Sequence, residues 1–161
     1  NVQTRIDKVR AGQVDATFLA LAGLKRLGLE GEADLILSAD EFLPCAGQGA
    51  IGIQTRTDDS SIHGLLEKIS CFETVRCVSA ERAALKILDG SCHTPIGVYA
   101  QLDGDQMNLR VLVAALDGST LYAQEKTELV ENIDSAQKFG ENLAKQLKEK
   151  IPAGILQQRA A

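Results

Sequence analysis

Three β-patterned runs joined by two short turns are the feature that most limits the folds open to this chain. Residues 96–102, 108–115 and 120–127 carry the residue pattern of strands. The connections at residues 103–105 and 117–119 read Asp-Gly-Asp and Asp-Gly-Ser, a composition typical of tight hairpin turns. The sequence therefore predicts a three-stranded antiparallel sheet in this region.

Two predicted helices can cover one face of that sheet. The first follows a capping-box pattern at Ser70 and Glu73 and ends at Gly90, with an apolar face made of Cys77, Ala80, Ala84 and Leu88. The second spans residues 134–150 and stops at Pro152, with an apolar face made of Ala136, Phe139, Leu143, Leu147 and Ile151. This part of the chain is expected to be an α+β domain with its helices on one face.

The first part of the chain has the helix-strand-helix order of an α/β layer. Residues 4–10, capped by Thr4, and residues 21–28 have helical patterns, and residues 15–20 have the pattern of a buried strand. These elements are too few to bury a two-layer core. We therefore expect the remaining strands to come from residues outside this sequence.

The middle of the chain carries weaker signals. Ser38 and Glu41 form a second capping-box pattern. A glycine-rich stretch then leads into a strand pattern at residues 50–54, and apolar residues recur at helical spacing over residues 62–69. Glycine-rich loops bind ligands in many proteins, but this one lacks the spacing of a phosphate-binding motif.

Cys92 lies between a predicted helix end and a predicted strand. The partial negative charge at a helix C-terminus disfavours a thiolate, so the position is poor for a low-pKa nucleophile. A permanent thioether anchor fits it better. A loop cysteine without any chemical role fits the same residues.

Composition excludes several classes of protein. With 161 residues and a net charge of −5, the chain is no general binder of nucleic acid or membrane surfaces. Its four cysteines contain no C-x-x-C pair, and neither His63 nor His93 stands at zinc-ligand spacing, so we expect no metal site. Cys45, Cys71 and Cys77 are expected to be small buried residues. No bilayer-length apolar run or signal core occurs, which favours the cytoplasm or an organelle matrix.

Five stretches of the chain resemble blocks of one enzyme family. Residues 89–97, DGSCHTPIG, resemble the cofactor-attachment loop of the porphobilinogen deaminase (hydroxymethylbilane synthase) family. Residues 1–5, 19–28, 43–53 and 80–83 resemble other blocks of that family in the same order. The resemblance covers nearly the whole chain and is weakest after Asp103. Several blocks in one order are a more specific signal than any single motif.

The resemblance implies a division of the chain. Residues 1–43 would be the second half of a periplasmic-binding-protein-like α/β domain, which is incomplete here. Residues 44–67 would be a hinge and a segment that returns to the first domain. Residues 68–161 would be the C-terminal α+β domain that carries the cofactor cysteine. The remainder of the enzyme, with its catalytic aspartate, would lie in a missing N-terminal portion, so we expect an incomplete, monomeric chain without activity of its own.

The resemblance also implies a function and a site. The family is a transferase of heme and other tetrapyrrole biosynthesis that joins four porphobilinogen molecules head to tail with loss of ammonia and releases hydroxymethylbilane by hydrolysis. The primer is a dipyrromethane cofactor, which Cys92 would hold as a thioether. Gln48 and Gly49 match residues at the cofactor and substrate cleft, and Arg5 and Arg26 match positions that bind the acetate and propionate groups.

Two other functions and one other interpretation of the arginines remain open from the residues alone. The chain could be a non-catalytic α+β binding or interaction module with incidental cysteines. A thiol enzyme using Cys92 with His93 as base is disfavoured, because adjacent residues where a strand begins point to opposite sides and no third, orienting group is identifiable. Arg5 and Arg26 could simply be solvated surface residues.

Overall fold

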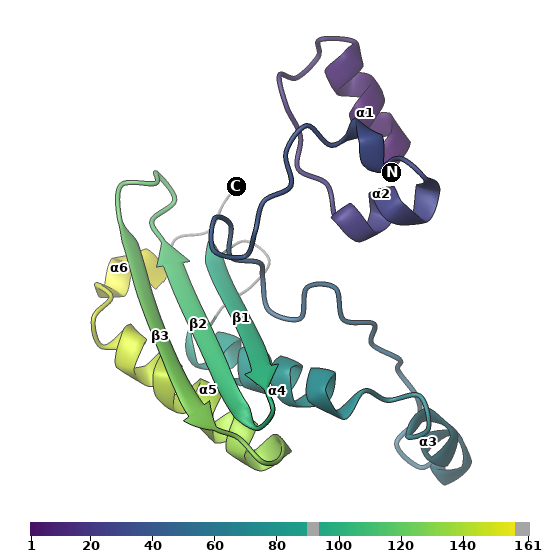
Figure 1. Cartoon of the computed structure of the whole chain (residues 1–161). Helices are drawn as coiled ribbons and strands as arrows, with labels where there is room; N and C mark the ends of the chain where they lie inside the picture. The colour runs from purple at the N-terminus through teal and green to yellow at the C-terminus, as the bar shows by residue number, and fades with distance from the viewer. Residues whose placement is uncertain (90–93, 157–161) are drawn as a thin grey trace. The chain divides into compact units, whose positions relative to one another are not determined.

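The computed structural model describes residues 1–89 and 94–156 in two compact units, Asn1–Glu41 and Phe42–Ala161. The first unit holds two short helices, α1 (Val2–Arg10) and α2 (Leu21–Leu27), and the 3₁₀ helix η1 (Glu30–Glu32) (Figure 1). The α1 helix begins before Thr4, because the Asn1 side chain accepts a hydrogen bond from the backbone N–H of Gln3 at 2.9 Å. The α2 helix ends at Gly28, as expected, in the left-handed conformation with φ of 67°.

Two predicted strands are wrong. Residues 15–20 and 50–54 form no strand, and apolar side chains in both remain exposed, with Phe18 at 71% and Ile51 at 86%. A strand exists only when a neighbouring strand pairs with its N–H and C=O groups. Among the described residues the one sheet is made of other strands, and neither segment pairs with it. Side-chain pattern alone therefore misassigned both segments.

The second unit contains the predicted sheet. Strands β1 (Ile96–Asp103), β2 (Gln106–Ala114) and β3 (Leu121–Leu129) pair antiparallel in the order β1-β2-β3 (Figure 1). The two turns contain Gly104 and Gly118 with φ of 59° and 70°, values that glycine adopts without strain. The hairpin interpretation of the two Asp-Gly turns is confirmed.

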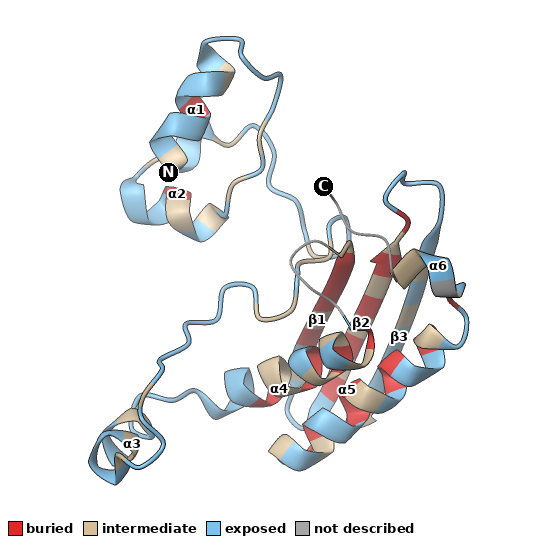
Figure 2. Cartoon of the chain, turned by 180° about the vertical axis from the view of Figure 1, so that it is seen from behind, coloured by how far each residue is buried: buried red, intermediate tan, exposed pale blue. Residues whose placement is uncertain are grey.

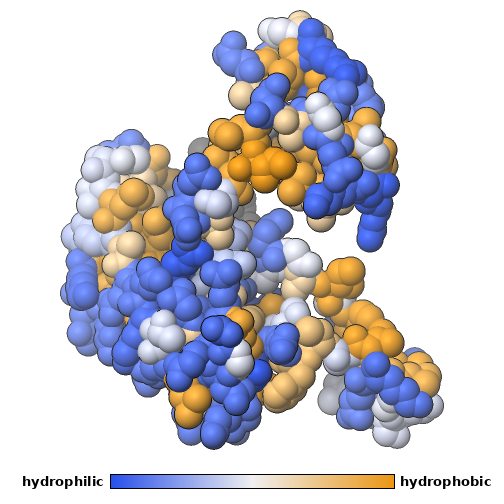
Figure 3. All heavy atoms as spheres, in the orientation of Figure 1, coloured by the Kyte–Doolittle hydropathy of each residue, from blue (hydrophilic) through white to orange (hydrophobic). Residues whose placement is uncertain are grey.

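Helices α4 (Phe72–Ile87) and α5 (Ile133–Lys148) cover one face of the sheet, and the short α6 (Ala153–Leu156) follows (Figures 1 and 2). Alternate β2 residues are buried toward the helices, and all five predicted apolar residues of the last helix are buried with them. The opposite face of the sheet is mostly hydrophilic in its lower part and mixed at its upper end (Figure 3). The α+β arrangement with helices on one face is therefore the fold of this unit.

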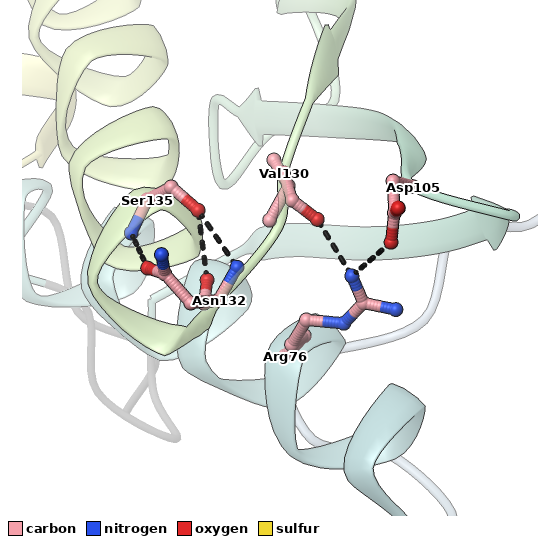
Figure 4. A network of polar contacts seen from close by, with 5 residues as sticks. All are labelled: Arg76, Asp105, Val130, Asn132 and Ser135. Atoms are coloured by element: carbon pink, nitrogen blue, oxygen red, sulfur yellow. Dashed lines mark hydrogen bonds and ion pairs between the residues drawn. The ribbon is translucent and has the colours of Figure 1, made fainter.

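Several predicted helix ends differ from the structure. The Ser70 hydroxyl does not cap α4 but donates to the carbonyl oxygen of Leu66 at 2.9 Å, at the end of α3 (Ser60–Leu66). Ser38 and Glu41 do form reciprocal contacts, although they stabilise a turn and no helix follows. The reciprocal capping box of α5 uses Asn132 and Ser135 (Figure 4).

A buried arginine joins α4 to the sheet. Arg76 Nη1 donates to the side chain of Asp105 at 2.7 Å and to the carbonyl oxygen of Val130 at 2.6 Å (Figure 4). Asp105 lies in the β1–β2 turn, and Val130 directly follows β3. The contact therefore ties the first half of α4 to one end of the sheet, where the β1–β2 turn and the end of β3 are neighbours. None of the helices in the described residues is long and apolar enough to cross a membrane.

Candidate functional site

The proposed anchor, Cys92, lies in residues 90–93, outside the described residues. The chain on both sides of it is held in place. Before it, α4 ends at Ile87 instead of continuing to Gly90, and Asp89 takes a left-handed φ of 53°. Lys148 Nζ, from α5, donates to the carbonyl oxygen of Ile87 at 2.7 Å and to Asp89 Oδ2 at 3.0 Å. The chain just before residues 90–93 is thus held by hydrogen bonds from α5.

The chain after Cys92 is fixed by the sheet. Ile96 begins β1, and its N–H donates to the carbonyl oxygen of Thr94 at 2.8 Å. The carbonyl oxygen of Pro95 accepts a hydrogen bond from the N–H of Ala114 at 2.9 Å, which continues the β1–β2 pairing. Residues 90–93 therefore connect two elements of known position, the end of α4 and the start of β1.

The glycine-rich loop, residues 45–49, contains the candidate residues Gln48 and Gly49. The N–H of Gln48 donates to the carbonyl oxygen of Cys45, and the N–H of Ala50 donates to that of Gly47, each at 3.1 Å. The Cys45 thiol donates to Gln48 Oε1 at 3.0 Å. Gly47 and Gly49 have φ of 74° and 83°, which favour glycine. Both Gln48 and Gly49 are exposed, so a ligand can reach them.

The residues leading into the loop lie along β1. The carbonyl oxygen of Pro44 accepts a hydrogen bond from the N–H of Val98 at 2.9 Å. Leu43 packs so closely on Gly97 that a Cβ at position 97 would lie 3.1 Å from its carbonyl oxygen. The residues that lead into the glycine-rich loop therefore lie along the first half of β1, the strand that begins shortly after residues 90–93.

A buried carboxylate completes this arrangement, and the sequence analysis missed it. Glu81, on α4, is 5% exposed, and its two oxygens accept hydrogen bonds from the N–H of Gly47 at 2.7 Å and from the N–H of Ala100 at 2.9 Å. Burial raises the pKa of Glu81, and the two hydrogen bonds partly offset that rise. The signal was present, because Glu81 stands on the apolar helix face between Cys77 and Ala84.

Arg5 and Arg26 lie in the first unit, on α1 and α2. Both are exposed, and neither guanidinium forms a hydrogen bond or ion pair with another described residue. Arg10, by contrast, pairs with Glu32 at 2.7 Å. An unpaired guanidinium offers a planar set of donors that fits a carboxylate, and a solvated helix surface shows the same exposure.

The other cysteines differ from the expectation. Cys45 and Cys71 are exposed, and only Cys77 of the three packs against the hydrophobic core, where burial raises its pKa. The two exposed cysteines lie in or beside loops, where the local sequence carried no burial signal. The described part of the chain contains no group of three His, Cys, Asp or Glu side chains that could hold a metal ion.

Comparisons with known proteins match the chain along most of its length. Residues 1–64 match the family model "Porphobilinogen deaminase, dipyromethane cofactor binding domain", and residues 75–149 match "Porphobilinogen deaminase, C-terminal domain". Arg5, Arg26, Gln48 and Gly49 fall within the first match, and Cys92 within the second.

Curated relatives carry the same family name. The chain is 47% identical over 150 residues to porphobilinogen deaminase of Nitrobacter hamburgensis, which covers 93% of this chain and 46% of that protein. It is 47% identical to the enzyme of Sorangium cellulosum, over 92% of this chain and 50% of that protein. It is 43% identical to the chloroplastic enzyme of Oryza sativa subsp. japonica, over 96% of this chain and 43% of that protein. The chain spans about half the length of these relatives.

Proposed function

Because this chain belongs to the porphobilinogen deaminase family, we propose that it is part of a transferase that joins four porphobilinogen molecules head to tail and releases hydroxymethylbilane. The observation that carries the proposal is the ordered match of two domain models of one family. The complete enzyme is the full-length protein, with the N-terminal portion that the relatives' length implies.

The proposed domains follow the resemblance. Residues 1–43 belong to the second half of a periplasmic-binding-protein-like domain, residues 44–67 form a hinge returning to the first domain, and residues 68–161 form the C-terminal domain. The division of the chain between Glu41 and Phe42 supports a boundary close to the first of these. The exposed apolar residues of 15–20 and 50–54 support burial against residues supplied by the N-terminal portion.

Cys92 is the proposed point of cofactor attachment. When bound, the dipyrromethane supplies the pyrrole end to which the substrate units are joined. A thioether at Cys92 survives repeated cycles, whereas a thioester would be hydrolysed. The position suits this role, since the C-terminal end of α4 lies just before Cys92 and disfavours a reactive thiolate.

The remaining site residues bind acidic groups and shape the cleft. The unpaired guanidinium groups of Arg5 and Arg26 fit the acetate and propionate side chains, because each can donate two parallel hydrogen bonds to one carboxylate. Gln48 and Gly49 contact the cofactor or substrate from their exposed loop. The proton transfers belong to an aspartate in the N-terminal portion, so this chain alone is inactive. The proposed compartment is the cytoplasm or an organelle matrix, and a chloroplastic relative supports the latter.

Mass spectrometry of the freshly purified complete enzyme tests the proposal. Trypsin releases residues 87–110, in which Cys92 is the one cysteine. We expect this peptide to carry the mass of a dipyrromethane, and we expect Cys92→Ser to fold without it and without turnover. An unmodified Cys92 together with no turnover of porphobilinogen would favour a non-catalytic binding module. Turnover by the isolated 161-residue chain would show that the N-terminal portion is not required.

A further inference from the structure

The carboxylate of Glu81 joins three separate segments of the second unit. Glu81 itself lies in the middle of α4, its Oε1 accepts the N–H of Ala100 in β1 at 2.9 Å, and its Oε2 accepts the N–H of Gly47 at 2.7 Å. Hydrogen bonds between a backbone N–H and a charged oxygen are stronger than neutral ones. One side chain therefore sets the distance between a helix, a strand and the glycine-rich loop.

Burying a carboxylate at this position is costly for folding. Glu81 is 5% exposed, and within the described residues no lysine, arginine or histidine forms an ion pair with it. Its neighbours on the helix face, Ala80 and Ala84, are apolar and fully buried. An apolar side chain here would pack without the desolvation cost. The carboxylate must therefore serve a purpose that packing alone does not.

The carboxylate anchors the glycine-rich loop through the N–H of Gly47. Gly47 has no side chain to anchor it, and its φ of 74° sets the turn that presents Gln48 and Gly49. The hydrogen bonds of Gln48 in the described chain stay within residues 45–48. Gly47 directly precedes Gln48, and its N–H donates to Glu81, which lies outside the loop. This hydrogen bond therefore connects the loop to α4 one residue before Gln48.

We propose that Glu81 is a positioning residue, which holds Gln48 and Gly49 at a set position relative to α4 and β1. Glu81 belongs to α4, which ends shortly before residues 90–93. It also accepts a hydrogen bond from β1, which begins shortly after them. The proposal rests on the function proposed above, because Gln48, Gly49 and Cys92 matter together only if the cofactor lies between them. In this role Glu81 acts through the backbone N–H groups of Gly47 and Ala100 and not by contact with substrate or cofactor.

The test uses Glu81→Gln in the complete enzyme. Glutamine has nearly the same shape, but its side chain has one accepting oxygen and one donating NH₂ group, so it keeps at most one of the two bonds. We expect cofactor to be attached normally and kcat/KM for porphobilinogen to fall by roughly 10- to 100-fold, the effect of a small misplacement of positioning groups. The split between KM and kcat shows whether binding or a later step is affected.

Glu73→Gln is the matched control, because Glu73 is an exposed carboxylate on the same helix. We expect its kinetics to equal those of the wild type. Unchanged kinetics of Glu81→Gln would overturn the proposal. The proposal would also be overturned if the rate fell only in proportion to the amount of folded enzyme that carries cofactor. A purely structural residue would give that result.

Hydrogen exchange on the wild-type protein gives a second test that needs no variant and no activity. We expect the amide of Gly47 to be protected although Gln48 and Gly49 beside it are exposed. Exchange of Gly47 at the rate of an unprotected loop would overturn the proposal even if Glu81→Gln fails to fold. The two proposals fail separately, because a wild-type enzyme without cofactor and turnover contradicts the proposed function, whereas this exchange measurement addresses Glu81 alone.

Discussion

Gly140 of α5 lies against the backbone of Ala80 in α4, so close that a Cβ at position 140 would lie 2.1 Å from the carbonyl oxygen of Ala80. The obstacle is backbone and cannot rotate away. The two helices are therefore held at a separation that only a glycine at position 140 permits.

Gly140→Ala should destabilise the second unit, because the added methyl group must push α4 and α5 apart. Overpacking of this kind typically costs about 1–3 kcal/mol, and more where backbone has to move. Urea denaturation of the complete enzyme measures the loss. Gly64→Ala is the control, because Gly64 lies in α3 with no atom near its added Cβ, and alanine there should raise helix stability by up to about 1 kcal/mol. Equal effects of the two substitutions would contradict the close approach.

Arg76→Met should destabilise the fold more than Asp105→Asn. The methionine removes the donor to the carbonyl oxygen of Val130, a residue that is 0% exposed, and an unsatisfied buried acceptor costs about 1–3 kcal/mol. Asp105 has a side chain 58% exposed, so its ion pair is screened by water and its loss should cost under about 1 kcal/mol. Thermal unfolding of both variants compares them. A larger loss for Asp105→Asn would show that the ion pair, not the Val130 contact, stabilises this junction.

The pH dependence of stability should identify Glu81. Its pKa is raised above 4.5, mainly by burial, so the folded chain holds this proton more tightly than the unfolded chain. Between pH 4.5 and the raised pKa the folded state therefore binds more protons, and this contribution to stability is lost as the pH rises. Glu81→Gln cannot ionise and lacks that loss.

Urea denaturation in steps from pH 4.5 to neutrality measures this difference. We expect the free energy of unfolding to decrease with pH more for the wild type than for Glu81→Gln. Other groups titrate in both proteins, and their contributions cancel in the comparison. Parallel curves would mean that Glu81 has the same pKa in the folded and unfolded chain, which would contradict the raised pKa of Glu81.

Arg26→Lys should weaken substrate or chain binding in the complete enzyme more than it weakens folding. Lysine keeps the charge but loses the planar pair of donors that binds a carboxylate. A charge-assisted bond is worth roughly 1.5–3 kcal/mol, so catalysis or elongation should slow by about one to two orders of magnitude. Thermal unfolding and the distribution of enzyme-bound intermediates with one to four added units measure the two effects.

Arg10→Lys is the control for Arg26→Lys, because Arg10 is also exposed on the first unit but is paired with Glu32. We expect its rates and its distribution of intermediates to match the wild type. If Arg26→Lys also matches the wild type in both, Arg26 is a solvated surface residue, and the assignment of acidic-group binding to this unit is wrong.

Local signals sufficed where the interacting residues are neighbours in the sequence. The two hairpins close over a few residues, and the glycines at positions 104 and 118 carry the positive φ values that the turns need. The apolar face of the last helix likewise repeats within a single element, so its burial could be predicted without knowing its partner. The family could also be inferred from the sequence alone, because five motifs occur along the chain in the family's order.

Local signals failed where a second segment decides the outcome. Residues 15–20 and 50–54 have the side chains of strands, but no pairing partner in the described chain. Ser70 matched a capping box, yet the carbonyl oxygen of Leu66 competes for its hydroxyl. A pattern states which side chains suit an element and does not state which backbone groups are available to complete it.

The sequence by itself determined the sheet, the helix faces that cover it and the membership of the family, because these follow from local periodicity and from motifs in a set order. Only the tertiary structure decided that Glu81 accepts the N–H groups of Gly47 and Ala100, and that α5 approaches α4 at Gly140. Both depend on distances between backbones far apart in the chain. Such distances are set when the helices and the sheet pack together, and no single stretch of sequence encodes them.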